Sequence, residues 1–586
     1  MIMSCVKRFR SGFALRTARF GAAAGLLCLL SAAAPAGCSS GPAAAPGAVD
    51  SLVILHTNDV HSHLDPFETK TGERVGGVAA RAALIKRQRD LGGRVLLLDA
   101  GDLVQGTPYY NVFRGEVDHR LLDLLHYDAI ALGNHDLDDG VEAWRARAAK
   151  TQTPIVCANV FSVPSPVPAA AARTGVPATI RRNAKWIGGG KVAAETELHH
   201  IAEPYVILER GGLKIAVLGL MTPSLDRIVA ARKNQGVAIG SPVAAANFYV
   251  PKLRREADIV IALTHLGVDQ DRWLVDHVHG IDLVVGGHGH TPLFKPRLEK
   301  AEGGRATPIV QAGSWGHYLG RTTLRWSGDR AKAVFGRLIP VRPEEGEAAE
   351  VEALLATYRS RLGEGSDRIV FRSSKRVEFS SRREGDHPLG NFVSDVLRER
   401  SGADLAVMNA GGIRASFPAG DVRERDVVTM LPFDNRIVVL TMTGAEVQRM
   451  FDRLARHIGK GGFGHVSGAS YVVRGGRATE VRVWKKADKT GEPDGTAEWG
   501  AGIRRSRDGD PLDANRRYRV ATIDFLADGG DYFDELRDSK EKEWTQILLS
   551  DAAIEFLIAH PEYQFGPDGR VQWRGSGEAL RDMRSR

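Results

Sequence analysis

Cysteine is scarce in this chain of 586 residues, which contains four: Cys5, Cys28, Cys38 and Cys157. The first three lie in an N-terminal segment that we expect to be processed, so Cys157 is the one thiol left in the mature protein. A single thiol excludes an intramolecular disulfide even in an oxidising compartment. Because Cys157 lies in the apolar run 154–158 with no ligand-like neighbour, it is interpreted as a core side chain.

The apolar run near the N-terminus is too short to span a bilayer comfortably. It covers residues 20–34 and follows a basic stretch that ends at Arg19. A basic stretch before a short apolar core is typical of a secretory signal, whereas a membrane helix needs about 20 apolar residues. We expect residues 1–37 to be an export signal and residues 38–50 to be a flexible tether rich in Pro, Ala and Gly. The protein is then exported to the periplasm or cell envelope.

Two cleavage sites compete in this segment. Residues 36–40 (AGCSS) resemble a bacterial lipobox, in which Cys38 is lipidated, although Pro35 replaces the usual Leu three residues before the Cys. Residues 34–36 (APA) instead fit the small-x-small site of ordinary secretion. The lipoprotein is the favoured interpretation, and it attaches the protein to a membrane only through a lipid anchor at Cys38.

No strong excess of one charge sign runs along the body of the chain. The formal net charge is +8, but five basic residues belong to the expected signal: Lys7, Arg8, Arg10, Arg16 and Arg19. The remaining arginines are scattered among Asp and Glu. This pattern is typical of a solvated surface of mixed charge, so we expect no nucleic-acid polymer as a partner.

The length predicts two domains, and the chain shows no internal repeat. From residue 51 to 343, short apolar runs alternate with amphipathic stretches such as 77–89. The runs are 52–55, 95–98, 129–132, 214–220, 259–263 and 281–285. They are typical of strands buried on both faces, and the alternation indicates a layered α/β domain.

The composition changes after residue 343. Residues 344–362 are rich in Glu, Ala, Leu and Arg and predict one helix, which Gly363 and Gly365 end, so that 344–366 form a linker. A second, smaller α/β pattern covers 367–573, and the polar tail is 574–586. Strands are expected in this second domain at 405–408, 437–442 and 518–523.

A short polar segment follows each of five runs in the first domain. These segments are HTNDVH (56–61), DAGD (99–102), GNHD (133–136), TH (264–265) and GGHGH (286–290). Ligands bind at the carboxyl ends of strands in α/β sheets, so the five segments are expected to converge. Each alone has a structural explanation, such as a solvated turn or a core histidine, but the series favours a metal site. Mixed oxygen and nitrogen donors suit Zn²⁺ or Mn²⁺ and argue against an all-oxygen Ca²⁺ site.

The series DxH, GD, GNHD, TH and GHGH resembles that of the calcineurin-like metallophosphoesterases. The stretches LHTNDVH, LLDAGD, ALGNHDLD and VVGGHGHTPL are similar to the bacterial 5'-nucleotidase/UDP-sugar hydrolase family, and the resemblance spans residues 51–570. It implies a four-layer metallophosphoesterase β-sandwich flanked by helices, which a helix joins to a smaller α/β substrate-binding domain.

The resemblance also implies two divalent metal ions, which are Zn, Mn or Co. By motif, the first ion is held by Asp59, His61, Asp102 and His290. The second is held by Asp102, which bridges, and by Asn134, His265 and His288. A bridging carboxylate can hold two cations about 3.5–4 Å apart, an arrangement suited to phosphate-ester displacement.

The motif GNHxxD implies a catalytic dyad of His135 and Asp138. An imidazolium at His135 stabilises the negative charge of a phosphoryl transition state, and Asp138 orients the ring. The alternative for Asp138 is a carboxylate at a helix N-terminus. Asp136 stands where the family usually has Glu, and it is given no role. Three further histidines, His56, His63 and His317, are left unassigned.

Three segments of the second domain resemble the family's nucleotide-binding domain: NAGGIR (409–414), LPFDN (431–435) and DFLADGGD (524–531). The resemblance implies that Phe433 and Phe525 stack on a base, Asn409 contacts it, Asp531 binds the ribose and Arg414 binds phosphate. Two departures occur: Tyr532 and Phe533 follow the GGD directly, and extra residues precede the LGN motif at 389–391. A second phosphate-binding arginine is expected there, and we choose Arg383 over Arg382.

We therefore expect an exported hydrolase that releases phosphate from nucleoside 5'-phosphates by in-line attack of a metal-bound hydroxide, with UDP-sugars as a further candidate substrate. Alternatives on the same fold are a 2',3'-cyclic nucleotide phosphodiesterase with 3'-nucleotidase activity and, more remotely, a thiosulfate-pathway hydrolase. An alternative of another class is a catalytically silent surface binding protein.

Overall fold

The computed structural model describes residues 50–69, 71–163, 178–300, 306–326, 331–362, 367–484 and 509–573. The described residues all belong to one compact unit. The expected signal peptide, nearly all of the tether with Cys38, the glycines expected to end the linker helix, and the tail 574–586 lie outside the described residues. Within the described ranges, none of the helices is both long and apolar enough to cross a bilayer.

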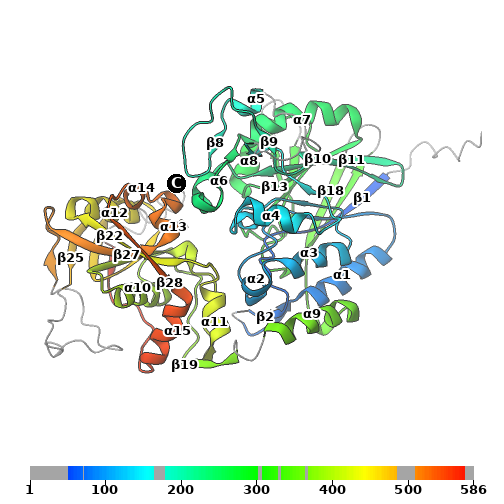
Figure 1. Cartoon of the computed structure of the whole chain (residues 1–586). Helices are drawn as coiled ribbons and strands as arrows, with labels where there is room; N and C mark the ends of the chain where they lie inside the picture. Colours follow the sequence, from blue (N-terminus) through cyan, green and yellow to red (C-terminus); the bar gives the residue numbers. More distant parts are fainter. Residues whose placement is uncertain are drawn as a thin grey trace, which may run out of the picture. The chain divides into compact units, whose positions relative to one another are not determined.

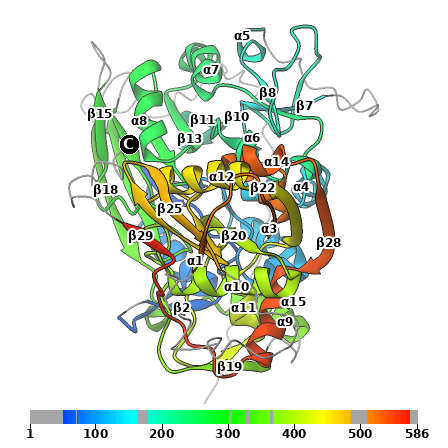
Figure 2. The ribbon, with the colours of Figure 1, turned by 90° about the vertical axis from the view of Figure 1, so that its left-hand side faces the viewer.

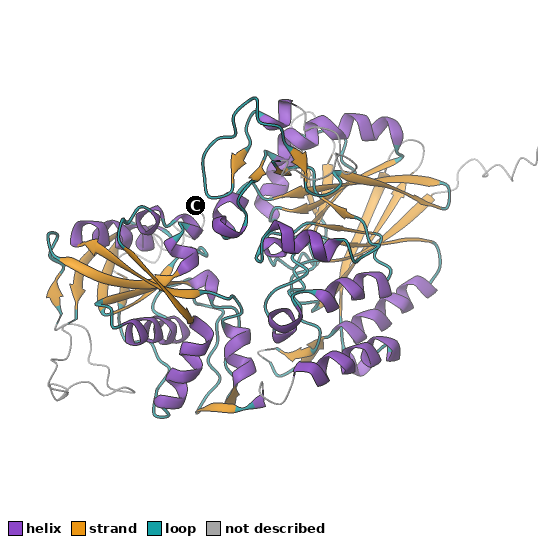
Figure 3. Ribbon diagram, viewed as in Figure 1, coloured by secondary structure: helices purple, strands orange, loops and turns teal. Residues whose placement is uncertain are grey.

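Two six-stranded sheets form the centre of the first lobe (Figures 1 and 3). The first has the order β18 (Ala331–Pro340), β17 (Tyr318–Trp326), β1 (Asp50–Thr57), β4 (Arg94–Asp99), β5 (Ala129–Ala131) and β6 (Ile155–Val156). The second has the order β10 (Tyr205–Arg210), β11 (Leu213–Met221), β13 (Ile259–His265), β14 (Leu283–Gly286), β16 (Ala306–Val310) and β15 (Arg297–Lys300). Buried side chains from both sheets, such as Leu96 and Ile261, pack into one apolar layer. The sheets therefore lie face to face.

Helices cover the outer face of each sheet. Helices α1 (Val78–Asp90), α3 (Glu116–Leu124) and α9 (Ala349–Leu362) pack beside one another against the first sheet (Figure 1). Helices α7 (Pro242–Glu256) and α8 (Val268–His277) cover the second. The order helix, sheet, sheet, helix confirms the expected four-layer sandwich.

Short elements connect these layers. They are β2 (Pro66–Glu68), β3 (Arg74–Gly76), α2 (Pro108–Phe113), α4 (Val141–Ala148), β7 (Val160–Ser162), α5 (Ala178–Arg181), β8 (Lys185–Trp186), β9 (His199–His200), α6 (Leu225–Ile228) and β12 (Val237–Ile239). Cys157 is fully buried in this lobe, and burial raises the pKa of its thiol to about 12, as expected of a core residue.

The second lobe is built on a five-stranded sheet. Its order is β23 (Gly464–Ser467), β20 (Leu405–Asn409), β27 (Arg517–Ile523), β22 (Arg436–Thr443) and β28 (Lys542–Leu548). A four-stranded sheet has the order β26 (Asp510–Pro511), β25 (Arg477–Val483), β24 (Ala469–Arg474) and β29 (Val571–Trp573), and β19 (Ile369–Ser373) pairs with β21 (Gly420–Arg423). The helices are α10 (Pro388–Ser401), α11 (Glu424–Met430), α12 (Gly444–Arg456), α13 (Asp524–Ala527), α14 (Asp534–Arg537) and α15 (Leu549–Ala559). Helices α10 and α15 lie side by side (Figure 2).

Every strand expected from an apolar run is present within a residue or two of its expected position. The expected helix 344–362 differs at its start. A short 3-10 turn covers Pro343–Glu345, and the helix itself begins at Ala349. The cause is Gly346, whose φ of 114° is incompatible with a continuous right-handed helix.

A buried ion pair ties helix α10 to the residue before β29. Arg570 donates two hydrogen bonds to the two carboxylate oxygens of Asp395, at 2.6 and 2.7 Å, and both side chains are almost fully buried. Ser467 Oγ and Tyr563 Oη donate to the same carboxylate. Without this carboxylate, Arg570 keeps one ion pair, from Nε to Asp568 at 2.7 Å, while its buried Nη1 and Nη2 lose their charged partner.

The substitution Asp395→Ala is expected to lower the free energy of unfolding by about 3–5 kcal/mol, the usual cost of breaking a buried pair. Chemical denaturation measures this change. The matched control is Asp421→Ala, because Asp421 pairs with Arg372 at 3.1 Å in the same lobe, where the two side chains are 34% and 79% exposed. Its effect is expected to stay below about 1 kcal/mol. Equal losses in the two variants would contradict this account.

Candidate active site

The two sheets bring the five polar segments to one edge of the sandwich. Strands β1, β4 and β5 are parallel neighbours in the first sheet, and β11, β13 and β14 are parallel neighbours in the second. The polar segments follow β1, β4, β5 and β14, and His265 ends β13. Since the carboxyl ends of parallel strands share an edge, residues 229 positions apart become neighbours, as His61 and His290 do.

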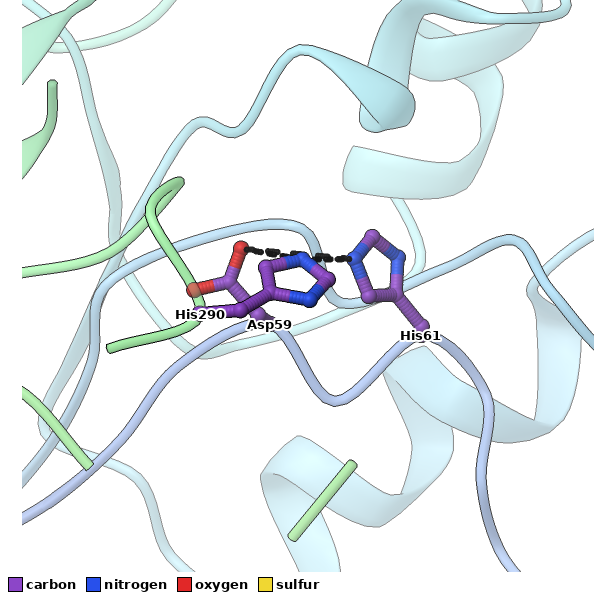
Figure 4. A group of neighbouring side chains, drawn as sticks. All are labelled: Asp59, His61 and His290. Atoms are coloured by element: carbon purple, nitrogen blue, oxygen red, sulfur yellow. Dashed lines mark hydrogen bonds and ion pairs between the residues drawn. The ribbon is translucent and has the colours of Figure 1, made fainter. Parts of the chain in front are cut away.

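Asp59, His61 and His290 form the first cluster (Figure 4). His290 Nε2 lies 3.4 Å from Asp59 Oδ1 and 3.0 Å from His61 Nε2. Two neutral imidazoles that face each other can share only one hydrogen, so a nitrogen lone pair points into the gap. One carboxylate and two imidazoles, with ligand atoms within 4.8 Å of one another, are a donor set suited to a borderline divalent cation.

Asp102, His265 and His288 form the second cluster, and Asn134 joins it. The amide oxygen of Asn134 lies 3.2 Å from His265 Nε2 and 3.0 Å from His288 Nδ1. Asp102 Oδ2 lies 3.1 Å from His265 Nε2. The same oxygen is 3.8 Å from Nε2 of His61 in the first cluster. Asp102 therefore stands between the clusters, and the seven side chains expected as ligands are brought together.

The backbone at these residues is unusual. Five of them have φ between 50° and 72°, in the left-handed region that residues with a Cβ rarely adopt: Asp59, His61, Asp102, His288 and His290. Such conformations cost of order 1–3 kcal/mol each and are concentrated at functional sites. A glycine makes the close approach of two of the loops possible, because a Cβ at Gly133 would lie 2.0 Å from the backbone nitrogen of Asp102.

His135 and Asp138 form a hydrogen-bonded pair beside the clusters. His135 Nδ1 lies 2.8 Å from Asp138 Oδ2, and the backbone N–H of His135 donates to Asp102 Oδ1 at 2.8 Å. Burial works against the charged ring, but Asp138 and Asp102 outweigh it and raise the pKa of His135 above its ordinary value. Asp138 follows the 3-10 turn His135–Leu137, while α4 begins later at Val141 with Gly140 as its N-cap. Asp138 is thus not a carboxylate at the N-terminus of α4.

Burial and neighbouring histidines act in opposite directions on Asp102. Burial alone would raise the pKa of its carboxyl, but His265 and His135 outweigh burial and hold that pKa well below its ordinary value. The carboxylate is therefore ionised at neutral pH, as a metal ligand has to be.

A cavity of about 1240 Å³ opens beside the two clusters and is lined by both lobes. The residues expected to bind substrate all line it: Asn409, Arg414, Phe433, Phe525, Asp531 and Arg383. Asn409 donates from Nδ2 to Asp531 Oδ2 at 2.7 Å, and Arg414 Nη2 lies 3.4 Å from His61 Nε2. The ring of Phe433 lies 5.6 Å, centroid to centroid, from the ring of His135.

Arg382 and Arg383, the two candidates for the second phosphate-binding arginine, both line this cavity. Arg382 is held in place, since it donates to the carbonyl oxygens of Ala410 and Phe379 at 2.8 and 3.2 Å. Arg383 Nε is buried without a hydrogen-bond partner among the described residues. Burial, and then the neighbouring Arg383 and Arg414, lower the pKa of Arg382 to about 8. The guanidinium groups of Arg382, Arg383 and Arg414, which line one cavity, favour an anionic ligand of more than one negative charge.

The three unassigned histidines lie outside the two clusters. His56 is fully buried beneath Gly320, and burial lowers its pKa to about 4. His63 stacks on Trp315 at 4.7 Å, and His317 stacks on Tyr318 at 4.0 Å.

The buried side-chain amides of Asn58 and Gln311 hydrogen-bond to the loops that carry the clusters. Neither residue was singled out from the sequence. Asn58 Nδ2 donates to Asp59 Oδ2 at 2.6 Å and to Gly313 O at 2.5 Å, and its Oδ1 accepts from the N–H of Ala312 at 2.7 Å. Gln311 Nε2 donates to Gly287 O at 3.0 Å, and its Oε1 accepts from Thr291 N–H at 2.6 Å. Gln311 thereby brackets the two histidines between Gly287 and Thr291. The signal for Asn58 was its place beside a ligand, whereas Gln311 follows a strand that lacks a recognisable motif.

Comparison with known proteins agrees with this geometry. The family model for calcineurin-like phosphoesterase matches residues 52–292, and that for the 5'-nucleotidase C-terminal domain matches residues 369–538. The 5'-nucleotidase of Vibrio cholerae is 28% identical over 92% of this chain and 97% of its own length. Protein UshA of Escherichia coli is 27% identical over 89% and 94% of the two chains. The solved 5'-nucleotidase precursor from Thermus thermophilus is 27% identical, with a TM-score of 0.76 over 90% of this chain and 100% of that chain.

The fold and these matches define the class: the protein is a metal-dependent phosphoric monoester hydrolase with a calcineurin-like phosphoesterase domain. It belongs to the 5'-nucleotidase family, in which that domain is followed by the 5'-nucleotidase C-terminal domain. The resemblance inferred from the motifs is confirmed.

The variant Asn58→Ala is expected to bind Mn²⁺ or Zn²⁺ about 10–100-fold more weakly, because partners that orient a ligand carboxylate tune metal affinity by that amount. Titration calorimetry on protein stripped of metal measures this affinity directly. The control is Asn247→Ala, whose side chain is exposed and donates to His277 O at 3.2 Å on the other side of the same lobe. An unchanged affinity in Asn58→Ala would show that Asp59 needs no such support.

Proposed function

We propose that this protein is an exported hydrolase that releases phosphate from nucleoside 5'-phosphates. The observation that carries the proposal is that a single cavity is lined by members of both Asp/His clusters, by Arg382, Arg383 and Arg414, and by Phe433 and Phe525. The clusters and arginines suit a phosphate, while the phenylalanine rings and the Asn409–Asp531 pair suit a nucleoside. The similarity to the 5'-nucleotidase of Vibrio cholerae and the 5'-nucleotidase precursor of Thermus thermophilus supports the same substrate class.

The residues present fit two divalent cations of the Zn, Mn or Co type. Asp59, His61, Asp102 and His290 would hold one cation. Asp102, Asn134, His265 and His288 would hold the other. Bound there, the pair would neutralise phosphate charge and activate the attacking water.

The dyad acts on the phosphate itself. During phosphoryl transfer, negative charge spreads over the phosphate oxygens, and a positively charged His135 ring stabilises that charge. Asp138 fixes the ring through its 2.8 Å contact with Nδ1, so that Nε2 remains available to the substrate. Arg414, next to His61, binds the phosphate from the side of the second lobe, and Arg383 assists.

Selectivity for nucleotides comes from the second lobe. Phe433 and Phe525 both line the cavity and offer aromatic faces to a base. Asn409 contacts the base, and Asp531, which accepts a hydrogen bond from Asn409, binds the ribose hydroxyls. The N-terminal signal and a lipid at Cys38 would keep the enzyme outside the cytoplasm and attached to a membrane.

The test is phosphate release from a panel of AMP, UMP, ATP, UDP-glucose and 2',3'-cyclic AMP, with Mn²⁺, Zn²⁺ or Co²⁺ added. Wild-type protein is expected to hydrolyse the 5'-phosphates, and Asp102→Ala is expected to lose essentially all turnover because both clusters lose a ligand. A preference for the cyclic nucleotide would instead indicate a cyclic phosphodiesterase. No release from any compound would indicate a silent binding protein, and full activity in Asp102→Ala would refute the mechanism.

The variant Phe525→Ala is expected to raise KM for AMP by about fivefold to about 100-fold, because stacking on an aromatic side chain contributes roughly 1–3 kcal/mol per base. Steady-state kinetics on AMP and on ribose 5-phosphate, which lacks a base, separate stacking from general damage. KM for ribose 5-phosphate is expected to change little. Equal increases for both substrates would argue against a base clamp.

A further inference from the structure

One arginine of the first lobe reaches both the dyad segment and the segment that carries Phe433. Arg114 follows helix α2 and lies on the wall of the cavity. Its Nη1 is 2.7 Å from Asp434 Oδ2 and 3.6 Å from Asp139 Oδ1. Asp434 is the residue after Phe433, and Asp139 is the residue after Asp138.

Contacts within the first lobe hold Arg114 and its partner Asp139 in place. The carboxylate of Asp139 also accepts a hydrogen bond from Tyr110 Oη at 2.8 Å, and Arg147 Nη1 lies 3.4 Å from it. The N–H of Arg114 donates to Tyr110 O at 2.7 Å, and Arg114 adopts a left-handed φ of 51° that ends helix α2. Backbone and side chain therefore hold Arg114 from two directions before it contacts Asp434.

The segment of the second lobe that Arg114 contacts has fewer restraints. Residues 431–435 connect α11 to β22, and the ring of Phe433 is only partly buried. Among the described residues, the contact with Arg114 is the one ion pair of this segment. The ring of Phe433 nevertheless lies 5.6 Å from the His135 ring, at an interplanar angle of 38°. Because Asp434 is the next residue in the chain, its ion pair with Arg114 limits where the ring of Phe433 can lie.

We propose that Arg114 is a positioning residue that, through Asp434, sets Phe433 above His135 and so favours phosphate esters that carry a flat base. This inference rests on the proposed function, because it assumes that Phe433 stacks on the base. Arg114 does not touch the reacting atoms in this account. Its effect is on the recognition of the base rather than on the chemical step.

Other ion pairs between the lobes provide a comparison. Arg227 lies 2.7 Å from Asp534, and Arg232 pairs with Asp524 and lies 3.5 Å from Asp528. In each case the arginine belongs to the first lobe and the aspartate to the second. The aspartates in these contacts lie at positions 524–534, around and after Phe525, whereas the partner of Arg114 is next to Phe433. Arg227 therefore serves as a matched control for general attraction between the lobes.

The experiment compares Arg114→Gln and Arg227→Gln with the wild type, using AMP and ribose 5-phosphate as substrates and a fixed metal. In Arg114→Gln, KM for AMP is expected to rise about threefold to fivefold, the effect of an exposed ion pair, while kcat stays within about twofold. The kcat/KM for ribose 5-phosphate is expected to stay near the wild-type value. In Arg227→Gln, any change is expected to affect both substrates alike.

A double-mutant cycle with Asp434→Asn keeps the test decisive if a variant is less stable. If the two side chains act through each other, the double variant loses no more affinity for AMP than either single variant. Equal loss for AMP and ribose 5-phosphate in Arg114→Gln, or an unchanged KM for AMP, would overturn the inference. Failure of the wild type to hydrolyse AMP would instead overturn the proposed function, so the two failures are distinguishable.

Discussion

The structure depends first on one buried carboxylate, that of Asp102. It stands between two groups of histidines, His61 with His290 and His265 with His288, and its Oδ2 lies within 3.8 Å of a nitrogen from each group. An unpaired carboxylate at this depth would be strongly disfavoured, so the surrounding imidazoles or bound cations have to compensate its charge. The packing of the two sheets, the left-handed loops and the glycines at the strand ends all serve to bring partners to this one group.

The two lobes contribute groups of opposite charge to the cavity. The first lobe supplies carboxylates and imidazoles around the clusters, while the second lobe faces them with three arginines that have no carboxylate partner among the described residues. At the rim the arrangement is reversed, because the arginines there belong to the first lobe and the aspartates to the second. Contacts at the rim can therefore join the lobes while the interior keeps unpaired positive charge for an anionic ligand.

Much of this organisation could be predicted from the sequence. The strands and the clustering of the polar residues were predictable because short apolar runs followed by Asp, Asn and His are local signals, and the family motifs fix their order. Residues such as Arg114 and Gln311 were not predictable. They act through partners 20 or more residues away or across lobes, and neither lies in a recognisable motif. The start of the linker helix was misplaced because the effect of Gly346 depends on its backbone conformation, which the local composition does not reveal.

The left-handed backbone at five residues of the two Asp/His clusters restricts how this enzyme can evolve. A β-branched residue is poorly tolerated in that conformation, and even another metal-binding side chain would have to accept the same turn. Change at these cluster positions is thus penalised twice, by the loss of a donor atom and by backbone strain. Adaptation to a different metal supply is easier at amides such as Asn58, which contact a cluster residue but do not belong to a cluster themselves. A substitution there can shift that residue without refolding its loop.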